Sequence, residues 1–223
     1  MTARIVVLSA PSGGGKTTIA KAVRERYPEK FGFSVSVTTR KPRPGEREGV
    51  DYFFQTRAQF FEGVAAGRFL EHAEYGRELY GTLKSEIEKV LKSGKHVLLD
   101  IEVEGARQVR EQYPAPRSVL IFILPSDPRV LLERLHSRKS ESPEQIRWRL
   151  DRAEYELNQA TRFERWVHND DLETAIEEVS AIADDPQVGQ TREQQDFEWI
   201  TNYGRGLMEA AQRLYDEQHQ QKG

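Results

Sequence analysis

The sequence predicts an α/β protein built around a parallel sheet with helices on its faces. Three apolar runs carry this prediction, at Ile5 to Leu8, Val97 to Ile101 and Ser118 to Leu124. Consecutive apolar positions are typical of strands that are covered on both faces, as they are in a parallel sheet. Segments with helical periodicity lie between and after these runs, and this alternation favours a doubly wound core.

The first apolar run ends at a glycine-rich turn, after which Ile19, Val23 and Tyr27 recur at helical spacing. This order indicates a strand, a loop and a helix. Residues 33–82 differ from the rest in composition, because β-branched and aromatic residues surround a Pro-Arg-Pro-Gly turn. We interpret this region as a mixed-strand insertion. Inside it, Thr56 with Gln59 predicts a capping box that starts a helix, and Gly67 predicts the end of that helix.

Later helices are marked by similar signals. Ser85 followed by Glu88 predicts a second capping box, with Gly94 as the stop. Asp127-Pro128 and Ser142-Pro143 each pair a cap residue with proline at the first helical position. We therefore expect two helices over residues 127–149, and we call this segment the lid.

The chain divides into a main domain, residues 1–184, and a C-terminal extension, residues 185–223. The main domain comprises core segments 1–32, 83–126 and 150–184 around the insertion and the lid. In the extension, a helical stripe of apolar residues is interrupted by Gly204 and Gly206. The extension is expected to form a helix that packs on the core or across a dimer. The stripe consists of Ile200, Tyr203, Leu207, Ala211 and Leu214.

Composition excludes several classes of function. The 223 residues carry 33 Lys and Arg against 36 Asp and Glu, so there is no broad basic surface and no nucleic acid partner is expected. The absence of cysteine excludes disulfides and thiolate chemistry and permits a reducing compartment. The apolar runs are too short to span a bilayer, and no secretory leader is recognisable, which predicts a cytoplasmic protein without a membrane partner.

A phosphate-binding loop is predicted between the first strand and the first helix. Glycines allow backbone N–H groups to close around a phosphate, Lys16 reaches the β and γ oxygens, and the Thr17 hydroxyl is a ligand for Mg²⁺. Ala10 stands where a glycine is usual; its methyl is harmless if the backbone φ is negative and costly if it is left-handed. A glycine-rich turn without function is the competing interpretation. The loop and the start of the helix comprise Ala10, Pro11, Ser12, Gly13, Gly14, Gly15, Lys16, Thr17 and Thr18.

A second group of residues suits a phosphate monoester that carries a purine base. Arg40 and Arg43 offer two guanidinium groups beside a proline turn, although a solvated basic loop would have the same residues. Glu71 lies in sequence among apolar residues, where an unpaired carboxylate would be costly to bury. The N1–H and N2–H₂ groups of guanine are two donors in line, which match the two oxygens of a carboxylate.

These segments closely resemble the guanylate kinases. The resemblance runs in register from about Arg4 to about Asp184. The matching segments are Phe31 to Glu46, Gly49-Val50-Asp51-Tyr52, Phe69-Leu70-Glu71, Tyr80-Gly81-Thr82 and Asp100-Ile101-Glu102 with Gly105.

The resemblance implies a P-loop NTPase-type sheet with a GMP-binding insertion, and it implies that residues 127–149 act as a lid over the transferred group. It also implies Mg²⁺-dependent, reversible in-line transfer of the ATP γ-phosphoryl group to GMP. The implied GMP-binding residues are Ser36, Arg40, Arg43, Tyr52, Glu71, Tyr80, Gly81, Thr82, Asp100 and Glu102. The implied ATP-binding residues, besides the loop, are Arg134, Arg138 and Asn169. The implied catalytic residues are Lys16, Arg40, Arg43, Asp100, Arg134 and Arg149.

The chain departs from the family pattern at a few positions. Lys139 replaces a glycine that is common in the lid turn, and Glu102 stands where some relatives carry aspartate. Two other functions are compatible with parts of the pattern. A P-loop kinase acting on a ribose bisphosphate would need no guanine reader, and a non-catalytic binding module would need neither Lys16 nor the lid arginines. GMP or dGMP as acceptor, and a monomer or a homo-oligomer, are alternatives left open at this point.

Overall fold

The computed structural model describes residues 2–136, 143–187 and 194–220. The chain forms two compact units. One comprises Met1–Leu8 and Ala20–Leu120, and the other comprises Ser9–Ile19 and Ile121–Gly223. The division passes through β1 (Ile5–Ser9), α1 (Lys16–Arg26) and β8 (Ser118–Leu124).

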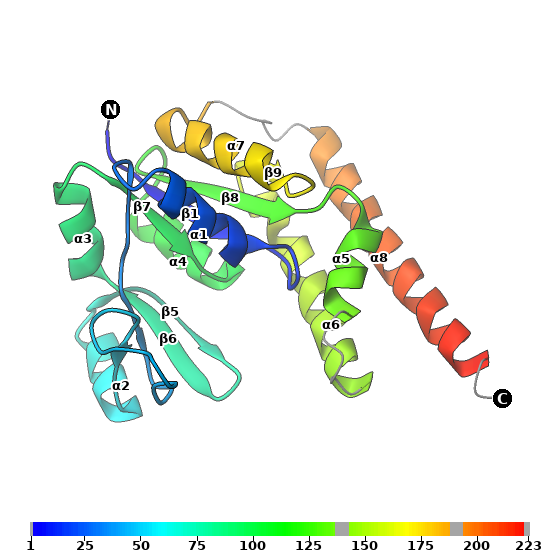
Figure 1. Cartoon of the computed structure of the whole chain (residues 1–223), viewed down its shortest axis with the longest axis horizontal. Helices are drawn as coiled ribbons and strands as arrows, with labels where there is room; N and C mark the ends of the chain where they lie inside the picture. Colours follow the sequence, from blue (N-terminus) through cyan, green and yellow to red (C-terminus); the bar gives the residue numbers. More distant parts are fainter. Residues whose placement is uncertain (1, 137–142, 188–193, 221–223) are drawn as a thin grey trace. The chain divides into compact units, whose positions relative to one another are not determined.

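The first unit contains a parallel sheet in the order β2-β7-β1. β7 (His96–Asp100) pairs with β1 so that Leu8 lies opposite Asp100, and with β2 (Phe31–Gly32) on its other side. The side chains of Ile5, Val6, Val7 and Leu8 are completely buried, as their consecutive apolar positions predict. α3 (Lys84–Lys92) packs against β7. The predicted parallel α/β sheet is therefore confirmed (Figure 1).

The first unit also contains a four-stranded sheet in the order β4-β3-β6-β5. Its strands are β3 (Ser36–Thr38), β4 (Phe53–Phe54), β5 (Phe69–Tyr75) and β6 (Glu78–Leu83). β3 pairs in parallel with β4, whereas the other pairs are antiparallel, so the predicted mixed-strand insertion is confirmed. Figure 1 shows β5 and β6 side by side, with α2 (Arg57–Ala65) next to them. A small core of Val37, Phe60, Phe69 and Leu79 holds this sheet together.

One predicted helix start is confirmed and another is wrong. The Thr56 hydroxyl accepts the Gln59 N–H and the Gln59 side chain accepts the Thr56 N–H, which is the predicted capping box. α3, however, begins at Lys84 and has Leu83 as its N-cap without a side-chain cap. The Ser85 capping box fails because the Lys84 N–H is bound to the Arg68 carbonyl, which places the end of β6 directly before the helix. Ser85 then lies inside the first turn.

The second unit contains β8 paired in parallel with β9 (Arg165–His168). All seven residues of β8 are buried. α7 (Leu172–Asp184) packs on β9. The remaining helices are α5 (Pro128–His136), α6 (Pro143–Gln159) and α8 (Gln194–Gln220), with a short 3₁₀ helix, η1, at Ala160–Arg162.

The predicted starts of the two lid helices agree with the structure where it describes them. The Asp127 carboxylate accepts the Arg129 N–H at 2.8 Å, and Pro128 is the first residue of α5. Pro143 is the first residue of α6, while its expected cap Ser142 lies outside the described residues. Every described helix is too short or too polar to cross a bilayer.

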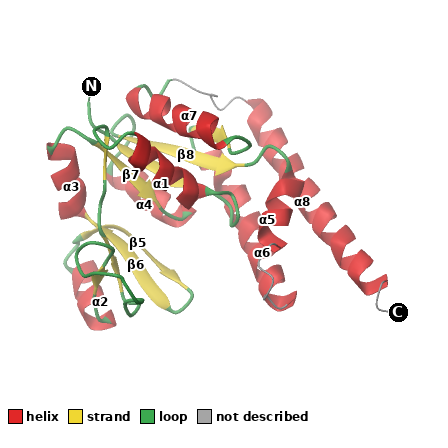
Figure 2. Cartoon of the chain, in the orientation of Figure 1, coloured by secondary structure: helices red, strands yellow, loops and turns green. Residues whose placement is uncertain are grey.

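The C-terminal extension forms α8, which confirms the predicted helix. It packs against α5, α6 and η1 of the same chain (Figure 2). Ile200, Tyr203 and Leu207 from the predicted stripe are buried there. The Trp199 ring lies 5.1 Å from the Tyr203 ring and 5.7 Å from the Trp166 ring, between centroids. α8 is therefore part of the folded second unit.

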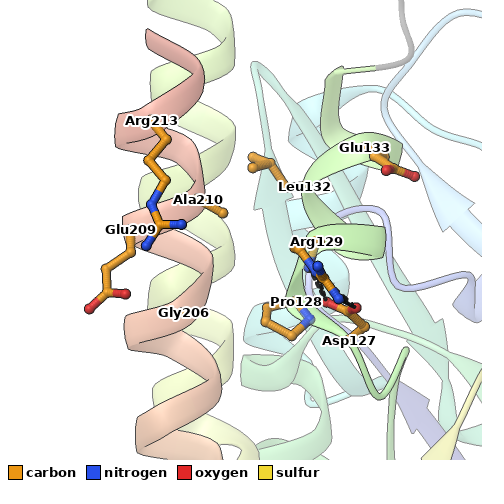
Figure 3. A pocket seen from close by; sticks show the side chains of 9 residues that line it. All are labelled: Asp127, Pro128, Arg129, Leu132, Glu133, Gly206, Glu209, Ala210 and Arg213. Carbon is orange, nitrogen blue, oxygen red and sulfur yellow. Dashed lines mark hydrogen bonds and ion pairs between the residues drawn. The ribbon is translucent and has the colours of Figure 1, made fainter. Parts of the chain in front are cut away.

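α8 approaches the start of α5 closely. A Cβ atom at Gly206 would lie 3.3 Å from Cγ of Pro128. Because glycine has no side chain, the two helices can approach one another closely at this point. Beside the contact, a pocket of about 430 Å³ opens between the two helices (Figure 3). Its lining residues are Asp127, Pro128, Arg129, Leu132, Glu133, Gly206, Glu209, Ala210 and Arg213.

Candidate active site

The loop between β1 and α1 has the backbone that its glycines predict. Gly13 and Gly15 adopt positive φ angles of 84° and 91°, which favour glycine strongly. The Gly14 N–H donates to the Pro11 carbonyl at 2.8 Å and closes the turn. A Cβ atom at Gly15 would collide with the Asn169 side-chain amide. The loop is therefore held in a conformation that only small residues permit.

Ala10 is compatible with this loop. No described residue other than glycine has a positive φ, so the Ala10 methyl group meets no backbone strain. Ala10 is buried, and its methyl carbon lies 2.9 Å from the place where a Cβ atom at Gly14 would stand. The harmless alternative for Ala10 is thus the correct one. The methyl group occupies space that the neighbouring glycine leaves empty.

Arg134 and Asn169 both lie at this loop. The Asn169 side-chain amide donates to the Gly14 carbonyl at 2.9 Å, and the Asn169 N–H donates to the Leu124 carbonyl at the end of β8. A guanidinium nitrogen of Arg134 lies 3.7 Å from the Cβ position of Gly15 and also donates to the Asn169 carbonyl at 3.3 Å. The structure therefore brings together two of the residues predicted on the ATP side. Arg138 lies outside the described residues.

Arg149 from α6 is also at the loop. Its guanidinium group is buried and donates to the Leu135 carbonyl at 2.7 Å and to the Ser12 hydroxyl at 3.4 Å. Leu135 belongs to α5, so Arg149 connects α5 and α6 to the loop between β1 and α1.

Glu156 is a residue of this region that sequence reasoning missed. Its carboxylate is 2% exposed, accepts the Ser12 N–H at 2.9 Å and pairs with Arg152 at 2.8 Å. The only signal in the sequence is the Arg152–Glu156 spacing, which is typical of an ordinary helix surface pair. That spacing does not indicate a contact 144 residues away in the sequence.

The remaining donor-side residues begin α1. Lys16 is the first residue of the helix and is partly exposed, whereas Thr17 and Thr18 are exposed. The Ile19 N–H donates to the Gly15 carbonyl and starts the helical ladder. The N–H groups of this first turn and the positive end of the helix dipole lie beside the glycines.

Arg40 and Arg43 lie in one turn that Glu46 closes. The Glu46 carboxylate accepts two hydrogen bonds from the Arg40 guanidinium group, at 2.8 and 3.0 Å, and one from the Arg43 N–H at 2.7 Å. The bond to Glu46, helped by Tyr80 and opposed by burial, raises the pKa of Arg40 above its usual value. The same contact with Arg40 lowers the pKa of Glu46. Glu46 was missed by sequence reasoning, although it belongs to the quoted Pro-Gly-Glu segment.

Two tyrosines surround Arg40. The Arg40 guanidinium carbon lies 5.4 Å from the centre of the Tyr52 ring, which lies 6.3 Å edge-on from the Tyr80 ring. Burial and the neighbouring Tyr80 raise the pKa of Tyr52, so its phenol remains a proton donor at neutral pH. Arg40, Tyr52 and Tyr80 are therefore brought together as predicted, while the Arg43 side chain is exposed.

Glu71 lies at the other end of the insertion sheet and is 5% exposed. The Thr82 hydroxyl donates to its Oε1 atom at 2.6 Å, and Ser36 lies opposite Thr82 in the β3–β6 ladder. A Cβ atom at Gly105 would lie 2.8 Å from Glu71 Oε2, and one at Gly81 would strike the Phe69 ring. These glycines leave the space that the buried carboxylate and the aromatic core require.

Asp100 and Glu102 follow one another where β7 ends and α4 (Val103–Gln112) begins. Asp100 is the last residue of β7 and is exposed. Glu102 is the N-cap of α4 but makes no side-chain cap bond. Asp100 is close enough to Tyr52 to contribute to the raised pKa of that phenol. The carboxyl end of a parallel strand is the usual ligand-binding edge of such sheets.

The residues predicted for the acceptor side lie in the first unit, and the described loop, arginines and Asn169 predicted for the donor side lie in the second.

Comparison with known proteins supports a single family. The family model described as guanylate kinase matches residues 2–185. A guanylate kinase from Gloeobacter violaceus is 48% identical over 179 residues, which are 80% of this chain and 86% of the relative. A guanylate kinase from Synechococcus sp. (strain JA-3-3Ab) is 44% identical over 186 residues, covering 83% of this chain and 84% of the relative.

A solved structure gives the same result. The crystal structure of guanylate kinase from Anaplasma phagocytophilum is 29% identical, with a TM-score of 0.64. The match covers 90% of this chain and 95% of that one. It therefore extends beyond residue 185, where the match of the family model ends.

Proposed function

The chain belongs to the guanylate kinase family, whose members are ATP:GMP phosphotransferases, and on this premise we propose which of its residues carry out the transfer. The observation that carries the proposal is the buried Glu71–Thr82 pair in the insertion sheet, together with the Arg40–Tyr52–Tyr80 group of the same sheet region. A buried carboxylate recognises the base, and a guanidinium with two phenols holds the phosphate.

On the acceptor side, Glu71 accepts hydrogen bonds from N1–H and N2–H₂ of guanine. Oε1 already accepts the Thr82 hydroxyl at 2.6 Å, and a carboxylate oxygen has a second lone pair for the base. Ser36 contributes a further hydroxyl beside Thr82. Adenine has an acceptor at N1 and no group at C2, so AMP would set a lone pair against the buried Glu71 carboxylate and offer it no donor.

The acceptor phosphate is held by Arg40 and Arg43 with the phenols of Tyr52 and Tyr80. The Arg40 guanidinium group is paired with Glu46, so a bound phosphate shares or replaces that partner. Guanidinium groups bind phosphate through two parallel hydrogen bonds, which fixes the direction of the acceptor oxygen. Asp100 and Glu102, at the carboxyl end of β7, complete this side.

On the donor side, the loop amides and Lys16 hold the β and γ phosphates. Arg134 lies at Gly15, and Arg149 lies at Ser12, so both arginines neutralise charge on the transferring group. Asn169, which holds the Gly14 carbonyl, borders the adenine. Phosphoryl transfer needs mainly positioned positive charge and exclusion of water, and this set of residues supplies the charge.

The donor side also suits Mg²⁺. The Thr17 hydroxyl is exposed at the start of α1 beside the glycine loop, where a metal bound to the phosphates would meet it. The described residues contain no group of three or more His, Asp or Glu that could hold a metal. When bound, the ion neutralises charge on the β and γ oxygens.

Substitution of Glu71 by glutamine tests the acceptor assignment. The amide retains the shape and one acceptor but sets an N–H donor against a guanine donor. We expect kcat/KM for GMP to fall by about 10²-fold or more, and the preference for GMP over AMP to narrow. A coupled assay with GMP, dGMP and AMP as acceptors measures both quantities.

Glu74→Gln is the matched control, because Glu74 lies three residues further along β5 and is exposed. This substitution should leave kcat/KM for GMP within about twofold of the parent value. If Glu71→Gln used GMP as well as the parent and still excluded AMP, the base would be read elsewhere and the assignment of Glu71 would be wrong.

A further inference from the structure

β5 contains a bulge next to Glu71. Phe69 lies opposite Leu83, whereas Glu71 lies opposite Thr82, so Leu70 is an extra residue in the β5–β6 ladder. A bulge leaves one residue outside the ladder and redirects the neighbouring side chains. In this strand it determines the direction in which the Glu71 carboxylate leaves the backbone.

β5 is also an edge strand of its sheet, because β6 is its only neighbour in the strand order formed by the described residues. The backbone groups on the free edge need other partners, since unpaired buried amides and carbonyls are costly. A bulge on such an edge is held in place only if something replaces the missing strand.

Two glutamines from α4 replace it. The Gln108 side-chain amide donates to the His72 carbonyl at 2.9 Å, and its oxygen accepts the His72 N–H at 3.1 Å. A primary amide carries a donor and an acceptor as a peptide group does, so Gln108 pairs with His72 as a neighbouring strand would. The Gln112 amide donates to the carbonyl of the bulged residue Leu70. The residues on both sides of Glu71 are thereby fixed to one helix.

The same helix also leaves room for the Glu71 carboxylate. Gly105 precedes Gln108 by one turn, and a Cβ atom there would lie 2.8 Å from Glu71 Oε2. Gly105, Gln108 and Gln112 have the i, i+3, i+7 spacing of one helix face. α4 therefore contacts the backbone before and after Glu71 and accommodates its side chain.

We propose that Gln108 and Gln112 are positioning residues for base selection, which hold the bulge of β5 so that both oxygens of Glu71 face the guanine edge. The proposal rests on the function proposed above for Glu71. Two donors in line require both carboxylate oxygens at a set distance and angle, and the geometry of a hydrogen bond tolerates little displacement. A loosened bulge thus weakens GMP binding and reduces the penalty that AMP meets.

Gln108→Met tests the proposal. Methionine is unbranched, similar in length and a good helix former, so the substitution removes both hydrogen bonds to His72 with little change in helix propensity. We expect KM for GMP to rise about tenfold and the GMP-to-AMP ratio of kcat/KM to narrow by a similar factor. The KM for ATP should stay within about twofold, because the hydrogen bonds removed join only elements of the first unit.

Two matched variants separate positioning from general stability. Glu111→Met places a methionine on the exposed face of α4. It should leave the KM for GMP and the GMP-to-AMP ratio of kcat/KM unchanged. Gln108→Glu keeps the acceptor for the His72 N–H but cannot donate to the His72 carbonyl. It should therefore raise the KM for GMP and narrow the GMP-to-AMP ratio less than Gln108→Met does. If Gln108→Met does not fold, Gln108→Glu and Gln112→Met provide the same readouts.

The double variant Glu71→Gln with Gln108→Met distinguishes this proposal from the one on which it rests. If Gln108 acts through Glu71, its substitution in the Glu71→Gln background should narrow the GMP-to-AMP ratio no further. A normal ratio in Glu71→Gln would overturn the role of Glu71 itself. A third outcome would show that the glutamines only stabilise the edge strand. In that case Glu71→Gln alters the GMP-to-AMP ratio, whereas the Gln108 and Gln112 variants keep the ratio of the parent and have a lower melting temperature.

Discussion

Two glutamates of the insertion have different surroundings, which fits the different roles proposed for them. Glu46 lies at the surface turn and is paired with Arg40, which keeps the pKa of Glu46 low. Glu71 is 5% exposed and binds the neutral Thr82 hydroxyl. The Arg40 guanidinium group binds both oxygens of the Glu46 carboxylate and so organises a loop, whereas the Thr82 hydroxyl donates to Oε1 of Glu71.

At the scale of single residues, Tyr203 offers a test of the buried C-terminal helix. Its side chain is 4% exposed, and its hydroxyl has no hydrogen-bond partner among the described residues. Burial, with smaller contributions from Asp127 and Asp170 and an opposing one from Arg134, raises the pKa of Tyr203. The folded state therefore binds this proton more tightly than the unfolded state does.

Tyr203→Phe should increase the free energy of unfolding at pH 7 by about 1 kcal/mol, because it removes a buried hydroxyl without a partner. Since the folded pKa is raised, the parent loses stability as the pH rises above the ordinary tyrosine value of about 10. The variant should lose less over the same range. Urea unfolding at pH 7 and between pH 9.5 and 11 measures both effects. If the free energy of unfolding fell equally with pH in the parent and the variant, the buried position of the phenol would be contradicted.

At the scale of elements, the contact between α8 and α5 depends on a missing side chain. Gly206 faces Pro128 with 3.3 Å between its Cβ position and the proline ring, whereas the Cβ position of Gly204 has open space around it. Both glycines lie inside α8, where glycine weakens a helix relative to alanine. Replacing glycine by alanine should therefore raise helix propensity equally at the two positions, while the packing around the new methyl group differs.

Gly204→Ala should raise the free energy of unfolding by about 0.5–1 kcal/mol, because it adds helix propensity without a clash. Gly206→Ala should gain less than Gly204→Ala or lose stability, since the new methyl group presses on the rigid ring of Pro128. Chemical denaturation of the two variants and the parent makes the comparison. An equal gain at both positions would mean that α8 and α5 are packed less tightly than their contact distance indicates.

At the scale of the whole molecule, the match of the family model ends at residue 185 but the folded second unit does not. Ile200, Tyr203 and Leu207 of α8 are buried, and α8 packs on α5, α6 and η1. α5 carries Arg134 and α6 carries Arg149, so the extension supports the helices on which the donor-side arginines stand. No predicted site residue lies in the extension itself.

Ending the chain after Gln187 should therefore lower stability more than it alters chemistry. Loss of these three buried apolar side chains should reduce the free energy of unfolding by at least about 2 kcal/mol. At a temperature where the truncated protein is folded, KM for ATP should rise, while KM for GMP should stay near the parent value. Thermal unfolding and steady-state kinetics at 20 °C test this. An unchanged melting temperature would contradict a structural role for α8.

Sequence alone determined the elements whose signals are local. The buried strand β8 was predicted from Ser118 to Leu124 because Val119 to Leu124 are all apolar, and the Thr56–Gln59 box was predicted because a cap involves only neighbours. The family was recognisable because its motifs recur in order and spacing, and the comparisons confirm it. A cap at Ser85 predicts that the helix begins at Glu86. It begins two residues earlier, at Lys84, because the Lys84 N–H binds the Arg68 carbonyl, a contact that no local signal shows.

Only the tertiary structure decided which distant groups meet. Glu156 binds the Ser12 N–H across 144 residues, and Gln108 pairs with His72 across 36, although both residues occur on ordinary helical patterns. The packing partner of α8 was likewise undetermined, because an apolar stripe indicates that a face is buried and not what covers it. Hydrophobic periodicity is a property of one segment, whereas these contacts depend on how the chain brings separate segments together, which no single segment encodes.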